Sequence, residues 1–224
     1  GMIDAALKLA SSVNYQGIGT FEFLLDNDQP EQFYFMGANP RIQVEHSITE
    51  QITGVDLVQS QIKLAMGYSL ADLNLLQPPP INGCAVQLRI NLETIDSDGK
   101  TQPATGTLSA YQPPSGPGLR VDGYGYPGYS INPNYDSLLA KLIVHAPDYP
   151  SALRKAYRAL CEFNIEGVSN SISLLQSLLQ LPEVARNEVN TRFVEKQMSR
   201  LRDCAHPHLY FNHGASPTAS PRAT

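Results

Sequence analysis

The sequence predicts an α+β fold in two parts. Segments with helical apolar periodicity are interspersed with short segments rich in aromatic and β-branched residues, which is typical of mixed helices and strands. In the second half, Gly and Pro separate the strand-like segments, as in an antiparallel sheet. The linker-like stretch QPPPING at 77–83 divides the two parts. We therefore expect one domain at 2–76, a second at 83–200, and a tail without regular structure at 205–224.

The first part is predicted to combine a helix, a two-stranded hairpin and two further helices. Residues 3–14 place Ile, Ala and Leu on one helical face. The segments GIGTFEFLLD and FYFM, joined by the turn-like NDQPEQ, indicate two strands. Two helices are expected at 45–52 and 55–66, each followed by a glycine.

The second part is predicted to form a mainly antiparallel sheet covered by helices. Apolar or alternating segments predict strands at 84–93, 106–112, 119–123 and 138–146. Apolar residues at helical spacing predict helices at 149–163, 170–181 and 190–201.

Composition excludes several classes of function. The 224 residues carry a net charge of −5, which gives no electrostatic basis for binding nucleic acid or an anionic membrane. No apolar run reaches the roughly 18 residues of a membrane span. The three cysteines are widely spaced and odd in number, and this pattern favours a reducing compartment, so a cytoplasmic location is expected.

A polar array follows the second predicted strand. Asn39, Arg41, Gln43 and Glu45 are spaced by two residues, so in an extended segment all four would point into one cleft, with the intervening apolar residues facing the core. Arg41 offers a planar donor fork for a carboxylate, bicarbonate or phosphate, and Glu45 is a candidate general base. A surface ion pair between Arg41 and Glu45 would produce the same pattern.

Two isolated charged residues are further candidates. Glu22 lies in a predicted strand between two phenylalanines and could, with Asn39, ligate Mg²⁺; taken alone, such a residue is more often a solvated strand carboxylate. Arg120 follows the glycine-rich SGPG and could bind an anion or an enolate, or be an exposed strand arginine.

Longer strings resemble one enzyme family. FYFMGANPRIQVEHSITEQITGVDLVQSQIKLAMG resembles the central signature of biotin carboxylases, the ATP-grasp components of acyl-CoA, pyruvate and urea carboxylases. The similarity continues through GPGLRVDGYGYPGYSINPNYDSLLAKLIVHA and IEGVSNSISLLQSLL to NTRFVEK, over roughly residues 3–197. The chain is most similar to the biotin carboxylase part of large multidomain acyl-CoA carboxylases. The resemblance implies the C-terminal part of an ATP-grasp domain at 2–76, followed by the biotin carboxylase C-terminal domain.

The resemblance also implies roles for individual residues. Glu22 and Asn39 would serve the magnesium and phosphate end of the site. Arg41, Gln43 and the Val44 backbone would hold bicarbonate. Glu45 would deprotonate bicarbonate for attack on ATP, giving carboxyphosphate, and Arg120 would stabilise the enolate-like form of biotin. Residues that fall near the adenine are Leu24, Met36 and Thr191.

Two departures from the family pattern affect these expectations. Gly37 stands where the family has the second carboxylate of the magnesium site. No lid or phosphate-gripping lysines precede residue 3, so we expect a fragment that is inactive alone, with no bound Mg²⁺ or ATP. In the parent, the expected partners are biotin carboxyl carrier and carboxyltransferase domains, with self-association. The alternative is a degenerate, non-catalytic module for assembly of a carboxylase complex.

Overall fold

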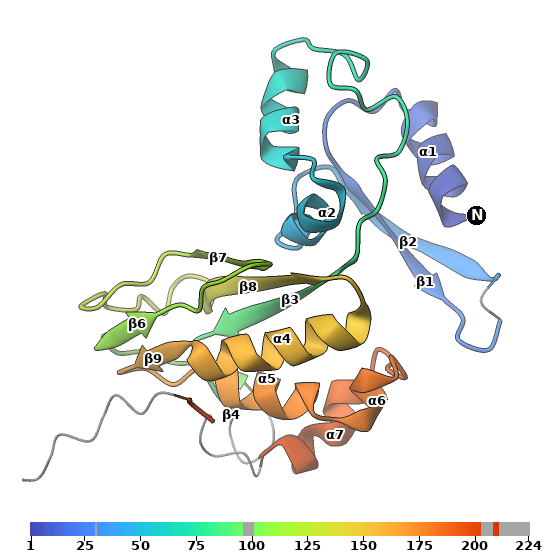
Figure 1. Ribbon diagram of the computed structural model, residues 1–224. Helices are drawn as coiled ribbons and strands as arrows, with labels where there is room; N and C mark the ends of the chain where they lie inside the picture. The colour runs from blue at the N-terminus through green and yellow to red at the C-terminus, as the bar shows by residue number, and fades with distance from the viewer. Residues whose placement is uncertain (30, 96–100, 203–207, 211–224) are drawn as a thin grey trace, which may run out of the picture. The chain divides into compact units, whose positions relative to one another are not determined.

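The computed structural model describes residues 1–29, 31–95, 101–202 and 208–210 (Figure 1). The chain forms two compact units, Gly1–Asn82 and Gly83–Thr224. No described helix has the length and apolar character needed to cross a membrane.

The first unit is built on one β-hairpin. Its elements are α1 (Met2–Ser12), β1 (Thr20–Leu25), β2 (Phe33–Asn39), α2 (His46–Thr53) and α3 (Leu57–Ala65). β1 and β2 pair antiparallel, with an irregularity in register between Glu22 and Phe23. The predicted hairpin and helices are confirmed, but β2 continues three residues beyond the predicted FYFM and ends at Asn39.

The first unit has few buried side chains. Ser47 is the only buried residue among residues 1–29 and 31–82. Phe23 contacts Phe33 and Phe35 edge to face, with ring centroids 5.6 and 5.7 Å apart, but these rings and α1 line a cavity of about 440 Å³. The predicted apolar face of α1 is correspondingly open: Ile3 and Leu7 are 72% and 61% exposed.

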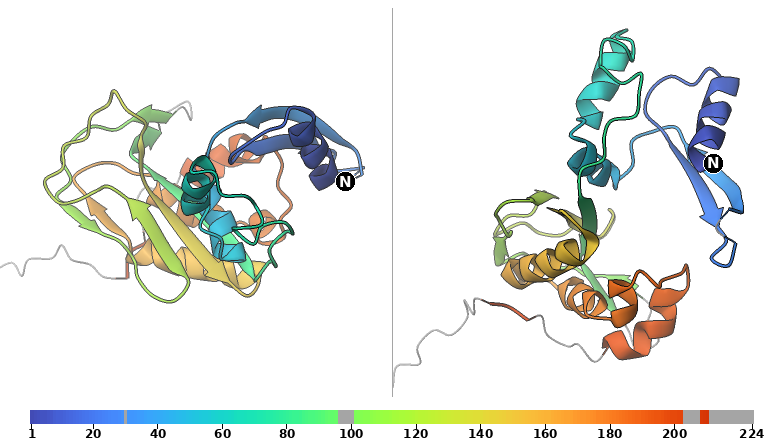
Figure 2. Two further views of the ribbon diagram at one scale, coloured as in Figure 1. Left: turned by 90° about the horizontal axis from the view of Figure 1, so that it is seen from above. Right: turned by 45° about the vertical axis from the view of Figure 1, so that its right-hand side comes forward.

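The second unit has a three-stranded antiparallel sheet in the order β3-β8-β7, which Figure 2 shows from two further directions. The strands and helices of this unit are β3 (Cys84–Asn91), β4 (Glu93–Ile95), β5 (Thr101–Pro103), β6 (Ala110–Gln112), β7 (Leu119–Gly123), β8 (Leu138–Ala146), α4 (Tyr149–Glu162), β9 (Asn164–Glu166), α5 (Ile172–Leu179), α6 (Pro182–Ala185) and α7 (Phe193–Arg202). Two small antiparallel pairs, β4-β5 and β6-β9, and an isolated bridge between Thr107 and Ser130 complete the pairing of this unit among the described residues. The mainly antiparallel sheet predicted for this part is confirmed.

The core of the second unit lies between the sheet and helix α4. Alternate residues of β3 and β8, including Leu88, Ile90, Leu142 and Val144, are buried against α4, and α5 packs on α4 (Figure 1). Burial of one such side chain contributes about 1.5–3 kcal/mol. Successive residues of a strand point to opposite faces, so the other face of β3, β8 and β7 carries Arg120, Asp122 and Lys141 together with the fully buried Ile143.

The short elements of the second unit were not predicted. β5 and β9 have three residues each and α6 has four, too few to produce a periodic signal. The predicted strand at 84–93 is divided into β3 and the start of β4. The predicted unstructured tail at 205–224 lies outside the described residues, except at 208–210.

Candidate anion-binding site

The β1–β2 pair sets the spacing of the first candidate residues. Thr20 pairs with Asn39, and Glu22 pairs with Gly37. Directly paired residues point to the same face of a sheet. Glu22 and Asn39 are therefore diagonal neighbours on one face of the hairpin, and Gly37 leaves the position directly opposite Glu22 without a side chain. Phe23, one residue further along β1, contacts Phe33 and Phe35.

A hydrogen-bond network joins three of the predicted site residues. The Asn39 amide Nδ2 donates to Glu22 Oε1 over 2.7 Å, and the Gln43 amide Nε2 donates to the same oxygen over 3.1 Å. Gln43 Oε1 is buried and has no hydrogen-bond partner among the described residues. One carboxylate thus orients two amides, and the free Gln43 oxygen can accept a hydrogen bond from a donor such as the O–H of bicarbonate.

The predicted extended conformation of the array is wrong beyond Asn39. The chain bends after β2, where Arg41 N–H donates to the Asn39 carbonyl over 2.8 Å, and Glu45 has helical backbone angles as the N-cap of α2. Pro40 fixes its own backbone and ends the strand, since it has no N–H for a sheet. Alternation therefore does not hold, and Val44, which was expected to face the core, is 36% exposed. The turn nevertheless brings Gln43 back to Glu22.

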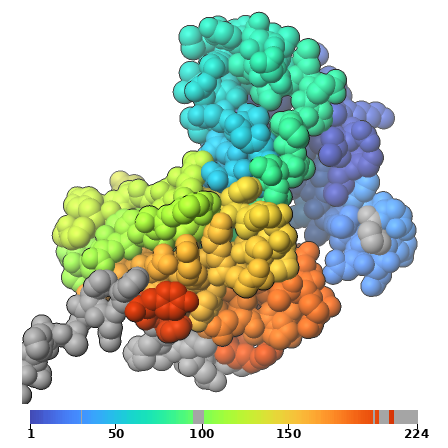
Figure 3. Space-filling view, viewed as in Figure 1, coloured from blue at the N-terminus to red at the C-terminus, as the bar shows by residue number. Residues whose placement is uncertain are grey.

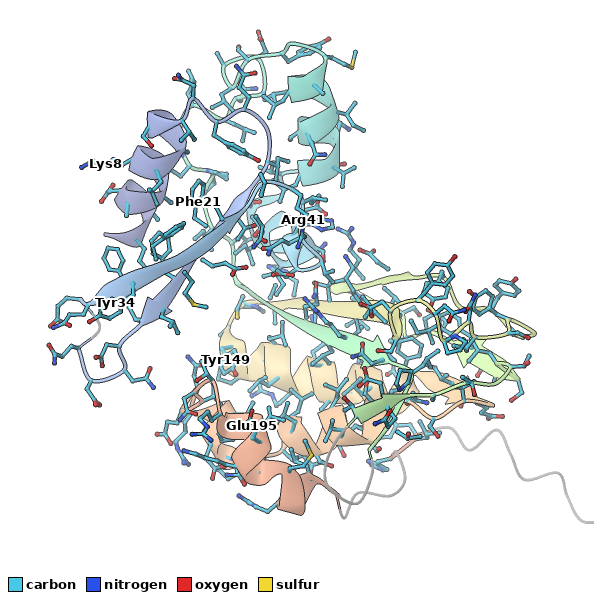
Figure 4. The ribbon with its side chains drawn as sticks, turned by 180° about the vertical axis from the view of Figure 1, so that it is seen from behind. Lys8, Phe21, Tyr34, Arg41, Tyr149 and Glu195 are labelled. Atoms are coloured by element: carbon cyan, nitrogen blue, oxygen red, sulfur yellow. The ribbon has the colours of Figure 1, made fainter. Side chains whose placement is uncertain are left out.

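Arg41 is exposed in this turn, where Figure 4 labels it. Its Nη1 donates to the Ile42 carbonyl over 3.1 Å, which fixes one corner of the guanidinium. Pro40 and Arg41 line a cavity of about 760 Å³ within the first unit, together with Tyr15, Gln61 and Tyr68. A cationic donor fork at the edge of a cavity can receive a small anion.

A metal site is incomplete in these residues. Glu22 is the one carboxylate of the network, and its Oε1 already accepts from two amides. No group of three or more His, Cys, Asp or Glu able to hold a metal occurs among the described residues. The set of Glu22 and Asn39 therefore does not by itself fit a resident Mg²⁺ ion. At Gly37 an added Cβ would meet nothing within 4 Å, so a larger side chain could be accommodated there.

Arg120 lies on β7 in the second unit and is held by an acidic partner that the sequence analysis missed. Its Nε donates to Asp122 Oδ1 over 2.8 Å, and Lys141 Nζ lies 3.3 Å from Asp122 Oδ2. Burial raises the pKa of the Asp122 carboxyl, but the hydrogen bonds and charges of Arg120 and Lys141 outweigh this and hold it below the ordinary 3.8. The sequence did carry a signal for this contact: Arg120 and Asp122 are two residues apart in a predicted strand, so their side chains share one face.

A glycine turn positions the beginning of β7. Gly118 has a φ of +73°, and an added Cβ would lie 2.5 Å from the His145 carbonyl oxygen. The Gly118 carbonyl accepts from the His145 N–H over 2.8 Å, which ties this turn to β8. Only glycine combines that backbone angle with so close an approach. Arg120 therefore follows a fixed turn rather than a flexible loop.

The residues assigned to the adenine lie in both units. Leu24 and Met36, on the hairpin, are 44% and 60% exposed. Thr191 is exposed in the turn before α7 of the second unit. Their role in binding adenine stays a prediction.

Comparisons with known families cover most of the chain. Residues 1–73 match the model described as the carbamoyl-phosphate synthase L chain ATP-binding domain. Residues 87–196 match the biotin carboxylase C-terminal domain. The boundary between these matches agrees with the division into units at Asn82.

Individual relatives give the same result. The chain is 45% identical to a biotin carboxylase from Nostoc sp. over 196 residues, which are 87% of this chain and 42% of that protein. A solved single-chain, multidomain long-chain acyl-CoA carboxylase aligns with a TM-score of 0.85 and 43% identity, over 91% of this chain and 21% of that one. The biotin carboxylase domain dimer of the 2-oxoglutarate carboxylase from Hydrogenobacter thermophilus, solved with MgADP and bicarbonate, aligns with a TM-score of 0.78 and 38% identity, over 88% and 42%. The chain thus spans less than half the length of these relatives.

Proposed function

We propose that this chain, whose sequence and fold match the C-terminal half of biotin carboxylases, supplies the bicarbonate-binding part of a biotin carboxylase active site. The observation that carries this proposal is the network in which Asn39 and Gln43 both donate to Glu22. Gln43 belongs to the same turn as the exposed Arg41. Such a network holds polar groups in place before a ligand arrives, and that preorganisation is how protein sites stabilise anions.

In this proposal, Arg41 and Gln43 hold bicarbonate. The guanidinium of Arg41 donates to two bicarbonate oxygens, the Val44 backbone N–H donates to one of them, and Gln43 Oε1 accepts from the hydroxyl. Glu45 then takes this hydroxyl proton from its hydrogen bond with Gln43, and a bicarbonate oxygen attacks the γ-phosphorus of ATP. The bond from that phosphorus to ADP breaks, and the products are carboxyphosphate and ADP. The relative solved with MgADP and bicarbonate is consistent with these substrates.

Arg120 acts in the second half of the proposed reaction. Carboxyphosphate releases CO₂ and phosphate; the released phosphate takes the proton of the biotin ureido nitrogen, and that nitrogen attacks CO₂. The negative charge that develops on the ureido oxygen is stabilised by the Arg120 guanidinium. Asp122 accepts a hydrogen bond from Arg120 Nε, and this bond orients the guanidinium. Both residues lie on β7, so the strand fixes their spacing.

The complete activity belongs to a longer protein or complex. Biotin on a carrier domain would be the acceptor, and a carboxyltransferase domain would choose the final substrate. The isolated chain is expected to be inactive and to hold neither Mg²⁺ nor ATP, with self-association through exposed apolar residues of the first unit.

A second candidate function rests on Gly37. Without a carboxylate opposite Glu22, the first unit could serve only as a structural module in the assembly of a carboxylase complex. The retained Glu22–Asn39–Gln43 network favours the catalytic reading, because an assembly role would not require these polar contacts.

A chimera tests the catalytic reading against the structural one. Residues 1–196 of this chain would replace the matching segment of the Nostoc biotin carboxylase, and biotin-dependent ATP cleavage would be measured with and without bicarbonate. Removing a general base by Glu45→Gln should reduce the rate by about 10²–10⁴. Equal rates for the chimera and its Glu45→Gln variant, both folded, would support the assembly module instead.

A further inference from the structure

A short C-terminal segment, His208–Tyr210, lies on the helices of the second unit. Figure 3 shows it in red on the surface beside the yellow and orange elements. Its residues contact α4 through Tyr157 and Cys161 and contact α5 through Gln176. The match to the biotin carboxylase C-terminal domain ends at residue 196. The segment at 208–210 therefore lies outside the part of the chain that carries the proposed function.

Gln176 binds the backbone of this segment at two points. Its Nε2 donates to the His208 carbonyl over 2.8 Å, and its Oε1 accepts from the His208 N–H over 2.8 Å. Gln176 is only 4% exposed and lies in the otherwise apolar stretch ISLLQSLL of α5. A buried amide is costly unless it is hydrogen-bonded, and here both of its polar atoms are satisfied by one residue's backbone.

The end of helix α4 supplies a third backbone contact. Cys161 lies in the last turn of α4, where carbonyl groups have no partner within the helix. Its carbonyl accepts from the Tyr210 N–H over 3.0 Å. The segment is thus recognised mainly through main-chain groups, at a helix end on one side and at Gln176 on the other.

The side chain of His208 covers the Cys161 thiol. His208 Nδ1 lies 3.1 Å from the Tyr157 hydroxyl and 3.8 Å from Cys161 Sγ, and Gln176 Nε2 lies 3.5 Å from the same sulfur. The Tyr210 ring contacts the His208 ring edge to face at 5.6 Å. Cys161 is 1% exposed with the segment in this position.

We propose that the surface formed by Tyr157, Cys161 and Gln176 is a docking site for this chain's own segment His208–Tyr210, bound through its backbone in cis. The docked segment closes over the Cys161 thiol on the helical side of the sheet. This proposal does not depend on any carboxylase activity.

The accessibility of Cys161 tests the proposal directly. N-ethylmaleimide labelling, followed by peptide-resolved mass spectrometry, reports Cys161 separately from Cys84 and Cys204. In a chain ending at Arg202, Cys161 should react at least about tenfold faster than in the full chain, since undocking no longer has to precede labelling. The same rate in both chains would overturn the proposal.

Point variants separate backbone recognition from side-chain packing. Tyr210→Pro removes the N–H that binds the Cys161 carbonyl and should accelerate labelling, whereas the matched control Tyr210→Ala keeps the N–H and should have a much smaller effect. Equal effects of the two would contradict backbone recognition.

If circular dichroism shows that the shortened chain is unfolded, Gln176→Leu in the full chain takes its place, because leucine fills the space without binding the segment. A Gln176→Leu rate equal to that of the full chain would then overturn the proposal.

Dilution distinguishes docking in cis from docking between two copies. The labelling rate of Cys161 in the full chain should not change with protein concentration. Faster labelling on dilution would assign the segment to a second copy and overturn docking in cis.

Discussion

Asn39 and Glu22 are joined across the β1–β2 hairpin by a hydrogen bond of 2.7 Å, and the carboxylate oxygen that accepts it also binds Gln43. The first bond connects residues 17 positions apart in the sequence, and the second ties the turn that carries Arg41 to β1. Glu22 therefore organises the candidate site as well as being one of its members. A change at Glu22 should disturb Asn39 and Gln43 together.

Replacing Asn39 with aspartate should turn this hydrogen bond into a repulsion. Two carboxylates this close cannot both ionise easily, so the pKa of the pair should rise in the folded state. A raised carboxyl pKa destabilises the fold at pH 7, and the effect should fade as the pH falls and the pair takes up a proton. Thermal unfolding of Asn39→Asp and Asn39→Ala between pH 4 and 8 measures this. A constant difference between the two variants at all pH values would contradict the close contact.

Asp122 should stabilise the second unit in a pH-dependent way. Because the folded-state pKa of its carboxyl lies below the unfolded value, the contribution is complete above the unfolded pKa and is lost as the pH falls through the folded pKa. Asp122→Asn should therefore lower the unfolding temperature at pH 7, with a difference that narrows below about pH 4. Denaturation scans of both proteins from pH 2.5 to 7 provide the test. If the difference in unfolding temperature grows toward low pH, the pKa of Asp122 is raised on folding and not lowered, and the prediction is wrong.

Mg·ATP should not bind tightly to the isolated chain. Glu22 is the one carboxylate that the described residues bring to the proposed metal end, and one carboxylate with amide oxygens competes poorly with the hydration of Mg²⁺. Isothermal titration should give no dissociation constant below about 1 mM, and Gly37→Glu should not change this in the isolated chain. Micromolar binding by the unchanged chain would refute this account of the metal site.

The first unit should associate through its hairpin. Phe35 and Met36 are 51% and 60% exposed, and large exposed apolar areas usually mark contact surfaces. Light scattering over a range of concentrations should show association that Phe35→Ser weakens. Tyr135→Ser is the matched control, since Tyr135 is 75% exposed in the second unit. A sharp monomer at high concentration, or equal effects of both variants, would contradict the prediction.

The sequence predicted the elements better than the contacts between them. Apolar residues at helical spacing were sufficient for α4 and α5, and a near-continuous apolar run was sufficient for β8, which is buried on both faces. It failed at 40–45, where Pro40 ends the strand and the turn places Gln43 on Glu22 instead of continuing the alternation. Turn geometry of this kind depends on contacts with distant residues, which spacing alone does not reveal.

The sequence did not identify the residues that contact one another across distant segments. Asp122 and Lys141 meet only because β7 pairs with β8, and this register could not be read from either segment. Gln176 carried a signal that was visible, a glutamine inside an apolar helix, but its partner is the backbone of residue 208. A buried polar residue in an apolar stretch predicts that a partner exists without identifying it.

The most direct test of the account concerns Gly37 in the complete active site. In the chimera with the Nostoc biotin carboxylase, the remaining site residues are expected to be in place and only the carboxylate opposite Glu22 is missing. Gly37→Glu should raise the biotin-dependent rate of ATP cleavage by about 10²–10³, the usual effect of one well-placed electrostatic contact. Gly37→Gln, which adds similar bulk without a charge, should give little gain. A Gly37→Glu chimera that is folded but no faster than its Glu45→Gln counterpart would contradict a catalytic role for these residues.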